Sequence, residues 1–325
     1  MKMAKLIKVL SIDGGGIRGI IPAIVLAEIE KRSKKRISEL FDLISGTSTG
    51  GILALALNVP KGKTKKAKYT AEELIELYEI EGENIFSRSV WHRIRSVGNL
   101  AEEKYPSNGI DSVLNKYFGD TKLKDSLTDL LVTSYEIERR IPWFFKSWKA
   151  NDKNLKGYDF PMSSVARATS AAPTYFEPQK IDISNKDYYA LVDGGVFANN
   201  PAMCAYVEAK SAHPKSDILV VSLGTGELTR RLPYNDVKGW GLANWAQPII
   251  SVVFDGVSDT TDYHLEKLLS SDRYFRFQLR LNEGNDDMDD ASKTNLRVLK
   301  LLAQDLVKSH STQINKVCKL LNSGK

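Results

Sequence analysis

The feature that most constrains the fold of this chain is a tight turn that reads Gly-Thr-Ser-Thr-Gly-Gly. A β-prone run at residues 41–45 precedes the turn, and an apolar run with helical character follows it at residues 52–57. Gly46 and Gly50, on either side of Ser48, permit a turn too sharp for larger side chains, as in the strand–turn–helix pattern G-x-S-x-G. The pattern predicts that the Ser48 hydroxyl lies at the N-terminus of a helix, where a negatively charged oxygen is stabilised.

The elements around this turn predict an α/β protein. A first strand is expected at residues 7–12 and a helix at residues 23–30, so the chain opens with a β-α-β-α order. This order is typical of a mainly parallel sheet that is covered by helices on both faces. Apolar patterns predict further strands at residues 129–135, 142–145, 188–192 and 217–222, and helices at residues 70–78, 109–118, 162–170 and 201–212.

We expect a single domain over residues 1–325, because no internal repeat and no linker rich in proline or serine divides the chain. The α/β core is expected at about residues 8–226, and a helical portion at about residues 240–325. The large apolar residues at the start of this portion are expected to pack in the core, and a lid or a membrane-facing surface is the alternative. These residues are Trp240, Trp245, Ile249, Ile250, Val253 and Phe254.

Composition is that of an ordinary soluble globular protein, with 42% hydrophobic and 26% charged residues. The sequence has no run of about 18 apolar residues, so we expect no transmembrane helix. The first residues lack the apolar core of a secretory signal. Two cysteines, Cys204 and Cys318, do not suggest a disulfide framework. These features predict a cytoplasmic protein.

The charged residues are concentrated in a few runs. The net charge is +6, partly from basic runs at residues 31–36 and 61–68. We favour a solvated surface for these runs over a weak attraction to an anionic membrane, which contributes about 1 kcal/mol per lysine. No nucleic-acid-binding signature accompanies the charge, so no nucleic acid polymer is expected as a partner. The acidic run at residues 286–290 lacks the glycine and glutamate of a calcium-binding EF-hand, which predicts a loop that caps the last helices.

The glycine-rich stretch after the first strand reads Asp-Gly-Gly-Gly-Ile-Arg-Gly. Gly14, Gly16 and Gly19 fit G-x-G-x-x-G, but the second strand does not end in the acid that a dinucleotide site needs, and no P-loop lysine follows. The backbone N–H groups of Gly14, Gly15 and Gly16 are therefore better suited to the oxygen of a tetrahedral intermediate beside a nucleophilic serine. Arg18 adds positive charge to this loop, unless it serves only in a salt bridge or a cap.

A nucleophilic serine needs a base, and Asp193 is a better candidate than any histidine. None of the four histidines follows a glycine-rich strand end: His92, His213, His264 and His310. Asp193 ends a β-prone run and precedes Gly194 and Gly195, so we expect it at the same edge of the sheet as Ser48. Alone, Asp-Gly-Gly is typical of a plain turn. An ordinary aspartate pKa of about 3.9 makes a weak base at neutral pH, so burial would have to help.

The three motifs together resemble those of the patatin-like phospholipase family. They lie at residues 13–19, 46–50 and 193–195, and similar stretches follow at residues 165–176, 196–201 and 222–226. The resemblance implies a three-layer α/β/α fold with a Ser–Asp dyad and no required metal or cofactor. It assigns Ser48 as the nucleophile and Asp193 as the general base. The loop of Gly14, Gly15 and Gly16 would form the oxyanion hole, with Arg18 nearby.

The implied reaction is hydrolysis of fatty acyl esters in glycerophospholipids or lysophospholipids by an enzyme associated with the inner face of the membrane. A finer resemblance, at residues 35–57 and 134–140, is to bacterial members without a secretory signal. Some of these are anti-phage effectors that a cyclic dinucleotide activates, so such an activator is a further expectation. A homodimer is a separate expectation. Two alternatives stay open, a lipid acyltransferase and a non-catalytic lipid-binding or storage protein.

Overall fold

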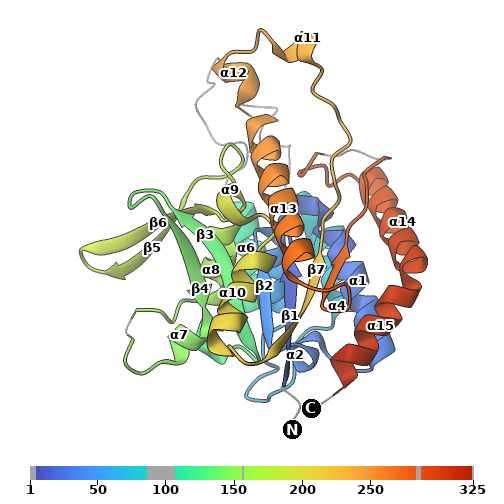
Figure 1. Ribbon diagram of the computed structural model, residues 1–325. Helices are drawn as coiled ribbons and strands as arrows, with labels where there is room; N and C mark the ends of the chain where they lie inside the picture. Colours follow the sequence, from blue (N-terminus) through green and yellow to red (C-terminus); the bar gives the residue numbers. More distant parts are fainter. Residues whose placement is uncertain (1–4, 86–106, 156, 247, 283–286, 324–325) are drawn as a thin grey trace.

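The computed structural model describes residues 5–85, 107–155, 157–246, 248–282 and 287–323, and it contains a central sheet with helices packed around it (Figure 1). The strands are β1 (Leu6–Ile12), β2 (Leu43–Gly46), β3 (Asp129–Glu136), β4 (Ile141–Lys146), β5 (Gln179–Ser184), β6 (Asp187–Asp193), β7 (Asp217–Leu223) and β8 (Tyr274–Phe277). The helices are α1 (Ile20–Ser33), α2 (Ile37–Leu40), α3 (Thr49–Ala56), α4 (Ala71–Ile85), α6 (Ser107–Phe118), α7 (Ser147–Asn151), α8 (Met162–Thr169), α9 (Gly195–Ala198), α10 (Ala202–Ala212), α11 (Tyr234–Val237), α12 (Leu242–Trp245), α13 (Pro248–Leu268), α14 (Lys293–Ser309) and α15 (Ser311–Asn322), with 3-10 turns η1 (Gly16–Gly19) and η2 (Leu123–Asp125).

The strands form one sheet in the order β5-β6-β3-β2-β1-β7-β8, and β4 pairs with β3. The part from β3 through β2, β1 and β7 to β8 is parallel. Strands β4 and β6 run antiparallel to β3, and β5 runs antiparallel to β6. The predicted α/β fold with a mainly parallel central sheet is therefore confirmed.

The hydrophobic core lies on both faces of the sheet. Along β1, Ile7 and Val9 pack with Ala205 of α10 on one face. Leu10 and Ile12 belong to the larger apolar cluster on the other face. Because alternate residues of a strand point to opposite faces, a strand covered on both sides must be apolar throughout. This is why β1 reads as an almost continuous apolar run.

Two strands, β5 and β8, lie where the sequence patterns predict none. Strand β8 pairs in parallel with β7 inside the portion that was expected to be helical. Strand β5 forms an antiparallel hairpin with β6. Both lie at the edges of the sheet, and β8 has only four residues, so local sequence alternation gives too weak a signal to predict them.

The expected core packing at the start of the C-terminal portion is confirmed for Ile250, Val253 and Phe254 and is wrong for the other three residues. Phe254 is buried, but Trp240 and Trp245 are only half-buried and Ile249 is exposed. Helices α11 and α12 and the first turns of α13 project from one end of the molecule (Figure 1). Few neighbouring elements are available there to cover apolar side chains.

The acidic stretch before α14 forms a loop and a helix cap. Ser292 is the N-cap of α14, and its Oγ accepts a hydrogen bond from the Asn295 N–H at 3.3 Å. Asp290 in turn accepts one from the Ser292 N–H at 3.0 Å. Asp286 lies outside the described residues. Within the described ranges, no helix is both long enough and apolar enough to cross a membrane.

Candidate active site

Ser48 occupies the turn between β2 and α3 in a strained backbone conformation. Its φ and ψ angles are 54° and −126°, a region that few non-glycine residues adopt. A Cβ atom on Gly46 would lie 2.2 Å from the Gly50 carbonyl oxygen, so no other residue fits there without movement. A Cβ atom on Gly50 would lie equally close to the Ile12 carbonyl oxygen. Close backbone approach, as predicted from the pattern, requires both glycines.

Hydroxyl groups on neighbouring elements hold this turn in place. The Ser48 N–H donates to Thr169 Oγ1 at the end of α8, at 2.8 Å. The side chain of Thr47 donates to the Ala198 carbonyl oxygen at 2.6 Å and lies 2.6 Å from Thr133 Oγ1. These contacts offset the strain of the turn and fix the direction of the serine side chain.

Asp193 reaches the serine from the opposite direction along the sheet. In the register of β3, Gly46 at the end of β2 pairs with Val132, and Asp193 at the end of β6 pairs with Ser134. Strand β6 is antiparallel to β3, so the carboxyl ends of β2 and β6 approach one another along it. The two residues meet for this reason, and not because parallel strands end at one common edge.

The carboxyl group of Asp193 is completely buried. Its Oδ1 accepts a hydrogen bond from the Gly195 N–H at 2.8 Å, while Oδ2 has no hydrogen-bond partner among the described residues. Burial raises the pKa of Asp193 to about 7, although the Gly195 N–H and the nearby Ser48 hydroxyl lower the pKa in part. A carboxylate with a pKa near neutrality is a much better proton acceptor than an exposed aspartate.

The glycine-rich loop after β1 carries two backbone N–H groups that are not used within the described structure, and it reaches the pocket of Ser48 at Gly16. The Gly14 N–H is already donated to the Asn199 carbonyl oxygen at 3.0 Å. The N–H groups of Gly15 and Gly16 have no hydrogen-bond acceptor among the described residues. Gly16, which has a φ of 59°, lines the same pocket as Ser48. The predicted three-residue oxyanion loop therefore offers two unused donors.

Two arginines hold the glycine-rich loop in place through hydrogen bonds and an ion pair. Arg18 donates from Nε to the Gly15 carbonyl oxygen at 3.2 Å and from Nη1 to the Gly226 carbonyl oxygen at 3.4 Å. Arg276 of β8 donates to both carboxylate oxygens of Asp13, at 2.6 and 3.0 Å. Burial raises the pKa of Asp13 to about 6, and Arg276 opposes that shift. Sequence reasoning missed Arg276 because strand β8 was not predicted.

Ser48 and Asp193 line a narrow apolar pocket with about 50 Å³ of free volume. The other walls come from the glycine loop, from α3, α4 and α6, from the segment after α8, and from α13. They include Ile17, Ile52, Leu77, Tyr78, Ile85, Ile110, Tyr175, Phe176, Phe254 and Met288. Such a lining suits an apolar chain and not a charged ligand.

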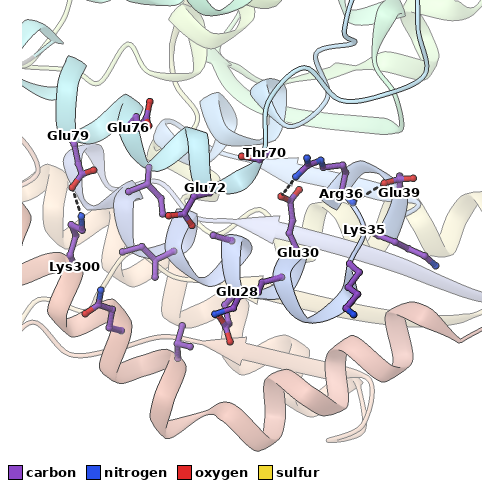
Figure 2. A pocket seen from close by; sticks show the side chains of 17 residues that line it. Glu28, Glu30, Lys35, Arg36, Glu39, Thr70, Glu72, Glu76, Glu79 and Lys300 are labelled. Atoms are coloured by element: carbon purple, nitrogen blue, oxygen red, sulfur yellow. Dashed lines mark hydrogen bonds and ion pairs between the residues drawn. The ribbon is translucent and has the colours of Figure 1, made fainter.

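A larger cavity, with about 910 Å³, lies elsewhere (Figure 2). Charged side chains of both signs line it, and ion pairs join Glu30 to Arg36 and Glu79 to Lys300. None of the predicted site residues borders this cavity. The chemistry of the glycine and serine motifs therefore belongs to the smaller apolar pocket.

No histidine lines the apolar pocket in the described part of the chain. His213 is an exposed residue at the end of α10, and His264 is exposed on α13. His310 joins α14 to α15, and His92 lies outside the described residues. Within the described ranges, no cluster of histidine, cysteine and acidic residues could hold a metal ion.

Comparison with known proteins identifies the family to which this α/β protein with a serine turn belongs. A family model for patatin-like phospholipases matches residues 10–206. Patatin-like protein 4 of Arabidopsis thaliana is 31% identical over 350 residues, which cover 97% of this chain and 86% of that protein. Patatin-T5 of Solanum tuberosum is 32% identical, over 96% of this chain and 86% of that protein. The chain belongs to the patatin-like phospholipase family.

Membership of this family supports lipid acyl hydrolase activity as the general class of reaction. One relative in Solanum tuberosum, 31% identical over 96% of this chain and 89% of its own length, carries the name probable inactive patatin-3-Kuras 1. Among solved structures, VipD from Legionella pneumophila aligns with a TM-score of 0.37 and 13% identity, over 94% of this chain and 67% of VipD.

Proposed function

We propose that this protein is a serine acyl hydrolase that releases fatty acids from glycerophospholipids or lysophospholipids. The observation that carries this proposal is the convergence of three groups in one apolar pocket. They are the hydroxyl of Ser48 in its strained turn, the buried carboxyl of Asp193, and the glycine loop, which reaches the pocket at Gly16.

In the proposed first half-reaction, Ser48 Oγ attacks the carbonyl carbon of the ester and its proton passes to the carboxylate of Asp193. The negative charge that develops on the carbonyl oxygen is stabilised by the N–H groups of Gly15 and Gly16 and by the N-terminus of α3. The intermediate then collapses, and the alcohol product leaves with the proton from Asp193. An acyl group remains on Ser48.

In the second half-reaction, water attacks the acyl carbon and Asp193 accepts a proton from that water. The fatty acid leaves, and the proton returns to Ser48 Oγ. A free volume of about 50 Å³ holds one or two water molecules, so the apolar pocket has to widen for an acyl chain. Its walls on α4, α6 and α13, including Leu77, Ile110 and Phe254, are the elements that would move.

The proposal is tested with phospholipid vesicles and mass spectrometry of the released lipids. Ser48→Ala should lower the rate of fatty acid release by at least about a thousandfold, because no other group can form the acyl-enzyme. His213→Ala, which changes an exposed residue, should alter the rate by less than about twofold. Undiminished release by Ser48→Ala, with an unchanged unfolding temperature in both variants, would contradict the assignment.

The same assay separates the remaining alternatives. Products in which the acyl group is attached to an added alcohol would indicate an acyltransferase, and lipid binding without any product would indicate a binding or storage protein. A panel of cyclic dinucleotides tests the proposed activation in anti-phage defence. Full hydrolysis without any nucleotide would contradict that more specific proposal and leave the lipid hydrolase assignment intact.

A further inference from the structure

The segment from Leu232 to Val252 presents apolar side chains to solvent on α11, α12 and the first turns of α13. We call this the α11–α13 surface. Leu242 is 93% exposed and Tyr234 is 77% exposed, and Leu232, Ile249 and Val252 are each exposed by more than a third. Single exposed apolar residues are ordinary, but a contiguous group on one projecting segment is typical of an interaction site.

Aromatic and basic residues accompany these apolar side chains. The rings of Trp240 and Trp245 pack edge to face at 5.3 Å, and both are half-buried. Between Leu228 and Pro248 the sequence contains three basic residues and one acidic residue. Arg231 and Lys238, two of the basic residues, are exposed. Aromatic side chains beside cations are the combination that favours the interface of an anionic bilayer.

The α11–α13 surface is continuous with the catalytic pocket. A cleft of about 470 Å³ runs between Leu232, Trp240 and Val252 on one side and Tyr175 and Met288 on the other. Tyr175 and Met288 also line the pocket that contains Ser48. The cleft therefore leads from the exposed segment to the serine.

Helix α13 runs from the α11–α13 surface to the catalytic pocket. Its first turn belongs to the exposed surface, whereas Phe254 lines the catalytic pocket and Ser258 accepts a hydrogen bond from Asn199 Nδ2 at 3.0 Å. Asn199 also holds the glycine loop through the Gly14 N–H. In Figure 1 this surface lies at the end of the molecule opposite both chain termini.

We propose that the α11–α13 surface docks on an anionic phospholipid bilayer and that a lipid enters the catalytic pocket through the adjoining cleft. The inference rests on the proposed function for the fate of that lipid, but the docking itself does not require catalysis. The exposed Arg231 and Lys238 complement anionic head groups, and the aromatic and apolar side chains suit the interfacial layer. The cleft gives a lipid in that layer a route to the catalytic pocket.

The test measures binding in the Ser48→Ala background, so that no lipid is consumed. Vesicles of phosphatidylcholine with an equal part of phosphatidylglycerol are sedimented with the protein, and pure phosphatidylcholine vesicles serve for comparison. Leu242→Asp should weaken binding to the anionic vesicles at least about tenfold, because it removes an exposed leucine that would enter the bilayer and adds a charge that the anionic head groups repel. Leu268→Asp, at the exposed far end of α13, is the matched control and should bind like the parent.

Two further readouts check the origin of the binding. Arg231→Glu with Lys238→Glu should abolish the preference for anionic vesicles, as should high salt. Vesicles should also shift the tryptophan emission to the blue, and Trp240→Phe with Trp245→Phe should remove that shift. Unfolding temperatures that match the parent would show that each variant is folded.

Equal vesicle binding by the Leu242→Asp and Leu268→Asp variants would overturn the proposal. So would a parent dimer that Leu242→Asp converts to monomer without loss of vesicle binding, because the surface would then be a contact between two copies. Failure of the Ser48→Ala protein to bind vesicles, while the unmodified enzyme hydrolyses soluble esters, would reject docking alone. Normal docking without any hydrolysis would reject the proposed function alone.

Discussion

Burial gives Asp193 the property that a base for Ser48 needs. The carboxyl has no exposed surface, one oxygen is held by the Gly195 N–H, and the other has no partner in the described structure. Desolvation disfavours the charged form and raises the pKa to about 7. The carboxylate form of Asp193 therefore has a high enough proton affinity to accept the proton of a serine that is attacking an ester.

The pH dependence of the reaction should show this shifted pKa. With a soluble short-chain ester, we expect kcat/KM to rise about tenfold per pH unit below the pKa of Asp193, because only the deprotonated form accepts the proton. The rise should end near pH 7. A profile that levels off near pH 4, the range of an ordinary aspartate, would contradict the role assigned to burial.

Stability should report the same titration independently of catalysis. The pKa of Asp193 is raised from 3.8 to about 7 in the folded protein. The protonated carboxyl therefore makes its full favourable contribution to the free energy of unfolding below pH 3.8, and this contribution is lost as the pH rises through 7. Asp193→Asn cannot ionise, so it should gain stability relative to the parent above pH 7, by up to about 4 kcal/mol. The two proteins should differ least in acid, and thermal unfolding across the pH range measures the difference.

At this scale the sequence is informative where backbone geometry restricts residue type. Gly46 is required by its contact with Gly50 and Gly50 by its contact with the adjacent end of β1, so the pattern identifies the place of Ser48. The position of Asp193 beside Ser48 is harder to predict from the sequence, because it depends on an antiparallel strand pairing. Thr169, which holds the Ser48 N–H, lies 121 residues away in the chain, and no local pattern predicts that contact.

Among the elements, the glycine loop depends on a strand that comes much later in the chain. Arg276 of β8 forms a bidentate ion pair with Asp13 at the start of the loop, and its Nη1 also donates to Ser222 Oγ of β7 at 2.9 Å. Both partners of the pair are largely buried. A buried carboxylate left without its partner is strongly destabilising, so this pair couples loop geometry to the edge of the sheet.

Replacing Arg276 should therefore affect both stability and rate. Arg276→Met is expected to lower the free energy of unfolding by about 3–5 kcal/mol, because it leaves Asp13 unpaired. It should also lower kcat on the order of tenfold or more, because the Gly15 and Gly16 donors lose their alignment. Chemical denaturation and steady-state kinetics measure the two effects.

Arg280→Met is the matched control for this prediction. Arg280 is mostly exposed and pairs with Glu227 at 3.4 Å on the surface, so its loss should change stability by less than about 1 kcal/mol. Equal effects of the two substitutions would show that the buried pair has no special role in holding the loop.

The sequence predicted the inner elements better than the outer ones. Strands β1, β3 and β7 lie close to their predicted ranges, because burial on both faces gives each of them a run of apolar residues. Strand β8 was missed, because its place in the sheet is decided by pairing with β7 and not by its own four residues. The same reasoning explains the half-buried Trp240 and Trp245, because the apolar character of a side chain predicts that it makes contacts but does not identify the partner.

At the scale of the whole molecule, the two ends of the chain are joined through a buried lysine. Lys8 of β1 is almost completely inaccessible, and its Nζ donates to the carbonyl oxygens of Leu321 at 2.7 Å and Ser323 at 2.9 Å. These carbonyls belong to the last turn of α15, whose acceptors have no partner within the helix. Helices α14 and α15 also pack against α1, so this contact helps to close the outer layer on the sheet.

Removing this contact should loosen the C-terminal helices before the rest of the fold. Lys8→Met keeps the length of the side chain but loses two charge-assisted hydrogen bonds, so we expect a loss of about 1–3 kcal/mol in the free energy of unfolding. Amide hydrogen exchange should accelerate most in α15, because its last carbonyls lose their donor. Lys5→Met, at an exposed lysine that pairs with Asp42 at 3.2 Å, is the control and should leave exchange in α15 unchanged. If Lys8→Met accelerated exchange uniformly over the sheet and the helices, the lysine would stabilise the fold as a whole and would not serve as a local clamp on α15.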